Sequence, residues 1–389
     1  MISKKIINVD ASFILSIFFL SIILFYPGGL ILESFYAPGD ETTYKSLAIK
    51  IVEKKIYAED FDNLRSWRPP GYPFYLSLFY FTFGDFGFRI IPYANFALYI
   101  VSYYFIFRSI KLFFKETESF LICLIVFLFH FNKFNQVLVI NYSEALFFFF
   151  LSSFFYLFVR SLLKKKHKSI ILSFFILGLS YMVRGPSLPL GITIIIFFSF
   201  FQKTFSKKII FLSLFFFLVP SIFWMTRNYY ILGFGPHMYT ANYILIYYGL
   251  FDFLDSGKID ELSRGLDDLG KINTYKPLII EKIKTDYVGA IILFVKKVLR
   301  HFYYHNTYLA FLFMAFSSCW LYLHNSKKIW SSLYEKKAKL FLLCLIISII
   351  FLLITSVAQF SWRYSLVPSI FFLLFSNCLF VILFNTYKK

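Results

Sequence analysis

Long apolar runs alternate with short polar segments along the whole chain, and this pattern predicts a bundle of membrane-spanning helices. Crossing a bilayer takes about 20 mostly apolar residues, and fewer where a helix is buried among others. The pattern predicts an all-α polytopic membrane protein with about ten spans (range 9–13), both termini inside. In residue numbers, the expected spans are 13–32, 88–107, 119–138, 143–162, 169–183, 187–201, 209–224, 308–324, 339–356 and 365–385.

Two polar regions are expected outside, a first outer loop at 33–87 and a long outer loop at 225–306. Each contains an apolar stretch too short to span, residues 72–84 in the first loop and residues 287–295 in the second, where we expect a surface helix at 287–301. Short amphipathic segments of this kind lie at the membrane surface. We expect residues 1–389 to form a single membrane-embedded domain with no separate soluble domain.

The positive charge fixes the expected orientation. Six short segments are assigned to the inside, and they hold 20 of the 40 Lys and Arg residues but only four of the 21 acidic residues. An excess of Lys and Arg in cytoplasmic loops is the usual signature of membrane topology. The six segments are 1–12, 108–118, 160–168, 202–208, 325–339 and 386–389.

Composition excludes several other classes of protein. The chain is 59% hydrophobic and only 16% charged, whereas about a quarter of a soluble domain is charged. Its net charge of +19 is explained by topology, and no nucleic-acid motif accompanies it. Its four cysteines form no CxxC pair or disulfide framework.

The sharpest candidates for catalysis are two adjacent carboxylates, Asp40 and Glu41, in the first outer loop. In a helix that starts near Gly39, Asp40 and Tyr44 share one face, while Glu41 lies beside Lys45. A carboxylate held near an acceptor hydroxyl or amine can remove its proton during nucleophilic attack. The alternative is structural, with Asp40 as a helix N-cap and Glu41 in a surface ion pair.

Glu144 is the candidate second acid. It opens a very apolar span, where it could orient the acceptor or, with Asp40, hold a divalent metal. The structural alternative is a carboxylate stabilised by the positive end of a helix dipole. We expect no specific cofactor, and a metal requirement stays open.

Four arginines are expected at the outer ends of spans or in outer loops. The planar guanidinium suits bidentate contact with phosphate. Charges at the edge of the hydrocarbon are costly unless they are paired or functional, which favours an anionic site over simple anchoring in lipid headgroups. The four are Arg68, Arg184, Arg227 and Arg363.

With these residues identified, the chain resembles the GT-C class of integral-membrane glycosyltransferases. It is most similar to the branch with protein O-mannosyltransferases and lipid A aminoarabinose transferases. The resemblance is carried by motifs in order, namely Asp40-Glu41-x-x-Tyr44, Arg68-Pro69-Pro70-Gly71-Tyr72-Pro73, Tyr142-x-Glu144, Arg184-Gly185-Pro186, Trp224-x-x-Arg227-Asn228-Tyr229 and Arg363-Tyr364.

The resemblance implies a GT-C fold and a sugar donor carried on a polyprenyl phosphate. It also implies transfer to a lipid, glycan or protein acceptor at the outer face of the cytoplasmic membrane, most simply a bacterial inner membrane. Asp40 and Glu41 would be catalytic, with Glu144 and Tyr44 at the acceptor or as a second acid. The donor phosphate would be bound by Arg68, Arg184, Arg227, Asn228, Arg363 and Tyr364.

Two alternative functions are a lipid-linked glycan polymerase and a flippase or other transporter. A transporter more often shows symmetric halves and polar residues at the membrane midplane. A polymerase would share the outer arginines but would not explain the Asp40-Glu41 pair. We therefore favour glycosyl transfer.

Overall fold

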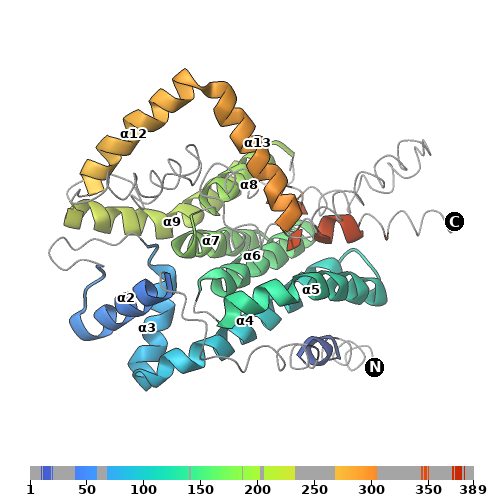
Figure 1. The fold of residues 1–389 in the computed structure, drawn as a ribbon. Helices are drawn as coiled ribbons and strands as arrows, with labels where there is room; N and C mark the ends of the chain where they lie inside the picture. Colours follow the sequence, from blue (N-terminus) through green and yellow to red (C-terminus); the bar gives the residue numbers. More distant parts are fainter. Residues whose placement is uncertain are drawn as a thin grey trace.

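The computed structural model describes residues 40–58, 68–139, 142–185, 187–201, 206–232 and 268–304, with parts of 10–20, 343–349 and 370–381. Every regular element in these residues is an α-helix (Figure 1). The all-α fold predicted from the hydrophobic pattern is therefore confirmed. The predicted spans 308–324, 339–356 and 365–385 lie largely outside the described residues, as does most of 13–32.

The predicted central spans all correspond to helices. Among the described residues, three helices are long and apolar enough to cross a membrane, namely α4, α6 and α9. The number of spans in the whole chain stays a prediction. The helices of this region are α4 (Phe86–Ile110), α5 (Glu116–Val139), α6 (Glu144–Lys164), α7 (His167–Val183), α8 (Ser187–Phe201) and α9 (Lys207–Leu232).

The centre of the bundle is a run of packed neighbours in which α6 lies between α4 and α7, and α7 also packs on α9 (Figure 1). The approach of α7 to α9 is close at Gly178, where an added Cβ would stand 2.3 Å from the carbonyl oxygen of Phe217. Phenylalanines fill much of this core, and Phe148, Phe154 and Phe155 are fully buried. Without a hydrophobic force between helices in lipid, such close packing holds them together.

The region predicted as the first outer loop contributes two short helices, α2 (Asp40–Lys54) and α3 (Gly71–Phe83), which pack against each other. The 13-residue length of α3 agrees with the prediction that residues 72–84 are too short to span. The helix stops at Gly84, whose φ of +58° is readily adopted only by glycine. A tight turn through Asp85 then starts α4.

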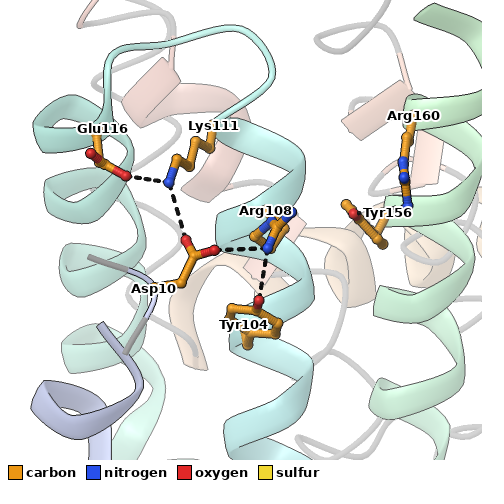
Figure 2. A network of polar contacts seen from close by, with 7 residues as sticks. All are labelled: Asp10, Tyr104, Arg108, Lys111, Glu116, Tyr156 and Arg160. Atoms are coloured by element: carbon orange, nitrogen blue, oxygen red, sulfur yellow. Dashed lines mark hydrogen bonds and ion pairs between the residues drawn. The ribbon is translucent and has the colours of Figure 1, made fainter. Parts of the chain in front are cut away.

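A network of charges lies at the far end of α4 from α3 (Figure 2). Arg108 donates to Asp10 at 2.7 Å and to the Tyr104 hydroxyl at 2.8 Å. Lys111 bonds to the other Asp10 oxygen at 3.1 Å and also pairs with Glu116. Partial burial alone would lower the pKa of Lys111, but hydrogen bonds to the Glu116 and Asp10 carboxylates raise it above its ordinary value. One acid thus ties the N-terminal segment to two basic residues.

Aromatic packing supports the same attachment. Phe13 stacks on Phe107 with ring centroids 4.2 Å apart, and meets Phe120 edge-on at 5.7 Å. These contacts place residues 12–18 beside α4 and α5.

The region after Trp224 differs from the prediction. The span predicted at 209–224 continues as one helix to Leu232, so Trp224, Arg227 and Asn228 lie on the last turns of α9 and not in a loop. Polar residues do not stop a helix whose backbone remains hydrogen-bonded, and here no Pro or Gly intervenes before Gly233.

The long outer loop contains α12 (Asp268–Thr285) and α13 (Tyr287–Tyr304), joined at Asp286 (Figure 1). The helix predicted at 287–301 is confirmed. It exposes an apolar stripe at helical spacing, while its location on the membrane surface stays a prediction. The stripe consists of Tyr287, Val288, Ile291, Ile292 and Val295.

The predicted topology can be tested at two exposed lysines, Lys284 in α12 and Lys166 between α6 and α7. In a cysteine-free background, we expect Lys284→Cys to react with a membrane-impermeant maleimide in intact spheroplasts. Lys166→Cys should react only after permeabilisation, because residues 160–168 are assigned to the inside. Equal labelling of both positions in intact cells would contradict this topology.

The Asp10 network predicts a measurable stability effect. Asp10→Asn keeps the size of the side chain but removes the charge that balances Arg108 and Lys111, which are partly exposed. We expect a loss of about 1 kcal/mol, seen as a lower thermal unfolding midpoint of the purified protein. Asp85→Asn, at an exposed turn, is the matched control. The same midpoint for both variants would refute a stabilising role.

Candidate active site

Helix α2 begins at Asp40, the first of the two predicted catalytic carboxylates. Glu41 pairs with Lys45 at 2.7 Å, which confirms the expected contact within the helix. Tyr44, one turn after Asp40, is buried and meets the Tyr72 ring edge-on at 5.1 Å. Because residues four apart share a helix face, Asp40 lies on the side of α2 that Tyr44 anchors. The side chain of Asp40 lies outside the described part of the structure.

The Arg68 turn is held against this anchored face. The Arg68 guanidinium carbon lies 5.6 Å from the centroid of the Tyr44 ring. Three residues later, Gly71 starts α3 so close to α7 that an added Cβ would stand 2.8 Å from the carbonyl oxygen of Met182. The turn therefore joins α2 to the end of α7, with its arginine beside the predicted catalytic helix.

Arg227 approaches the same region from the last turns of α9. It donates to the backbone carbonyl of Tyr57 at 2.8 Å and to the Asn228 amide oxygen at 3.0 Å. Its guanidinium carbon lies 4.9 Å from the Trp224 ring centroid and 5.8 Å from that of Tyr57. Among the described residues, no carboxylate pairs with this half-buried cation.

Trp224 adds an unused donor next to Arg227. Its side chain is buried, and no described residue accepts a hydrogen bond from its indole Nε1. Buried polar groups are nearly always hydrogen-bonded, so a donor left over beside a cation suits an incoming anion. We call Tyr44, Tyr57, Arg68, Trp224 and Arg227 the arginine cluster.

Glu144 and Arg184, predicted separately as a second acid and a phosphate ligand, form an ion pair. The distance from Arg184 Nη1 to Glu144 Oε1 is 2.6 Å, and the two side chains are 12% and 2% exposed. Glu144 is the first residue of α6, while Arg184 follows the last residue of α7. Each charge thus has a partner of opposite sign within the protein.

Tyr72 supports the arginine cluster from α3. It is fully buried, accepts a hydrogen bond from Asn95 Nδ2 at 3.3 Å and packs on Tyr44. Burial raises the pKa of Tyr72 well above its ordinary value, and the negative charge of Glu144 acts in the same direction. The tyrosine therefore stays neutral beside Tyr44.

The structure thus brings most of the predicted residues to one end of the bundle. Tyr57 bonds to both Arg68 and Arg227, Arg68 lies over Tyr44, and Asn228 accepts a hydrogen bond from Arg227. The Glu144–Arg184 ion pair joins the start of α6 to the end of α7. Arg363 and Tyr364 lie outside the described residues. Sequence reasoning did not select Tyr57, since no motif marks it. Trp224 was visible in its motif but had no assigned role.

The described side chains offer no ready metal site. No group of three or more His, Cys, Asp or Glu residues among them is placed to hold an ion. The idea of a metal between Asp40 and Glu144 involves a side chain outside that set, and it remains untested.

Comparison with known proteins gives one finding. The family model of dolichyl-phosphate-mannose-protein mannosyltransferases matches residues 67–225, from the Arg68 turn to the end of the region that contains Glu144, Arg184 and Trp224. No curated protein and no solved structure matches the chain. The match confirms the resemblance that the ordered motifs predict. Over residues 67–225, the chain is similar to the dolichyl-phosphate-mannose-protein mannosyltransferases, a family of GT-C membrane glycosyltransferases.

Proposed function

We propose that this protein transfers a sugar from a polyprenyl-phosphate donor to a lipid, glycan or protein acceptor. The protein crosses the cell membrane several times, and the reaction takes place at the outer face of that membrane, which in bacteria is the inner membrane. The observation that carries the proposal is the state of Arg227. Neutral groups alone hold it among the described residues, beside the unused indole N–H of Trp224 and near the helix that begins with Asp40.

The arginine cluster suits the leaving group of this reaction. As the bond from the sugar to the lipid phosphate breaks, negative charge grows on the phosphate. Cations fixed in place before the reaction stabilise that charge without having to reorganise. Arg227 is fixed by a carbonyl, an amide oxygen and two rings, all of them neutral, so its charge remains available to the phosphate.

Asp40 supplies the base in this proposal. It would accept the proton of the acceptor hydroxyl or amine as the acceptor attacks the sugar. Glu41 is turned toward Lys45 and has a secondary role. Tyr72, which packs on Tyr44, supports the face of α2 on which Asp40 lies.

The role of Arg227 predicts a specific loss of donor binding. Arg227→Ala removes a charge-assisted contact worth about 1.5–3 kcal/mol, so the affinity for undecaprenyl phosphate should fall about ten- to a hundredfold. Arg227→Lys should restore only part of it, because the planar fork is lost.

A matched control is available at the other end of the spans. Arg160 also stacks on a tyrosine, at 5.8 Å from the Tyr156 ring, but lies near the far end of α6 from Glu144. Arg160→Ala should bind undecaprenyl phosphate as the wild type does. If Arg227→Ala also bound it normally, Arg227 would be a structural anchor instead.

The role of Asp40 is tested by Asp40→Asn. Asparagine caps a helix as well as aspartate does, so the change removes the base and leaves a capping role intact. The rate of sugar transfer should fall about 10²–10⁴-fold, with normal membrane insertion and normal binding of undecaprenyl phosphate. Glu41→Gln should have a milder effect. Normal transfer by Asp40→Asn would remove Asp40 from the mechanism.

A further inference from the structure

We propose that Tyr57 is a positioning residue that joins Arg68 and Arg227 into a single phosphate-binding unit. This inference rests on the proposed function, since it takes the lipid phosphate of the donor as the ligand of both arginines. Tyr57 would not touch the reacting atoms. It would act through the two cations.

One half of the connection runs to the Arg68 turn. The Tyr57 hydroxyl donates to the backbone carbonyl of Arg68 at 2.7 Å. This bond joins two points of the first outer loop that are 11 residues apart in sequence. It holds the backbone from which the Arg68 side chain extends over Tyr44.

The other half runs to α9. The carbonyl of Tyr57 accepts a hydrogen bond from Arg227 Nη2, and its ring lies under the same guanidinium. The Trp224 ring meets Tyr57 edge-on, with centroids 4.9 Å apart, and also contacts the cation. Tyr57 therefore contacts both arginines, one through its hydroxyl and one through its carbonyl and ring.

The chain is shaped to deliver Tyr57 to this position. After the last turn of α2, Lys55 adopts a left-handed φ of +58°, and the Ile56 N–H bonds back to the Lys50 carbonyl. A non-glycine residue in this conformation is uncommon and implies support from its surroundings. That support is visible in the burial of Tyr57, which is 7% exposed and packs with Leu47, Tyr181 and Trp224.

The consequence is a coupling between two distant segments. Two guanidinium groups repel each other, and an anion between them relieves the repulsion. A neutral residue bonded to both can hold the two arginines in position for one phosphate. Loss of the Tyr57 hydroxyl should therefore weaken phosphate binding through Arg68 and leave Arg227 in place.

Tyr57→Phe tests this directly, because it keeps the ring and its packing and removes only the hydroxyl. The binding of undecaprenyl phosphate to the purified full-length protein should weaken about two- to tenfold, the range for one hydrogen bond. The neutral lipid undecaprenol measures binding that does not depend on the phosphate. The matched control is Tyr156→Phe, which removes a hydroxyl bonded to Arg160 at the other end of the bundle. It should bind as the wild type does.

A double-mutant cycle separates positioning from simple stabilisation. If Tyr57 acts through Arg68, Tyr57→Phe should cause no further loss in an Arg68→Ala background. Unchanged binding by Tyr57→Phe, or an equal loss in both backgrounds, would overturn the proposal. A different result would contradict the proposed function itself. If the wild type bound undecaprenol as tightly as undecaprenyl phosphate, the site would not recognise the phosphate, and the role of Tyr57 would be excluded as well.

Discussion

A buried or half-buried guanidinium needs partners within the protein, and the partners of each arginine organise the whole candidate site. Arg184 meets this need with a carboxylate, in a nearly buried ion pair with Glu144. Arg227 meets it with a carbonyl, an amide oxygen and two aromatic rings. The first solution cancels the charge, and the second holds the cation in place with its charge intact. This difference is the reason that we propose Arg227 as the main ligand of the donor phosphate.

Arginines at both ends of the bundle connect separate segments of the chain, but their partners differ. At the far end of α4, Asp10 balances Arg108 and Lys111 and ties the N-terminal segment to the turn before α5. At the other end, Tyr44 joins α2 to α3, while Tyr57 and the Gly71 contact tie this pair of helices to α7 and α9. The network at the first end is balanced internally, whereas Arg227 at the second end has no acidic partner among the described residues.

Much of the helical pattern could be read from the sequence because polar breaks separate the apolar runs. Gly84-Asp85 separates α3 from α4, and the turn at Arg184 separates α7 from α8, where residues 187–201 were predicted and found. The end of α9 was predicted too early, since the polar residues after Trp224 resemble a loop although nothing there breaks a helix. The short-range Glu41–Lys45 pair followed from helix geometry alone.

The candidate site was predictable only in part. Its charged residues stood out because charge is rare in this chain, but their partners depend on tertiary packing. The contact between Glu144 and Arg184 joins the ends of two helices, and no sequence spacing encodes it. Tyr57 is one of 29 tyrosines, and its position depends on a left-handed residue at Lys55, where the sequence has no glycine to mark the turn.

The central claim is that this chain uses a polyprenyl-phosphate sugar as a donor. The most direct measurement is mass spectrometry of surface glycans and lipid-linked sugars from cells with and without the protein. The account predicts that one sugar disappears from a surface lipid, glycan or protein while the matching polyprenyl-phosphate sugar accumulates. Identical surface sugars and identical polyprenyl-phosphate sugars in the two strains would contradict it.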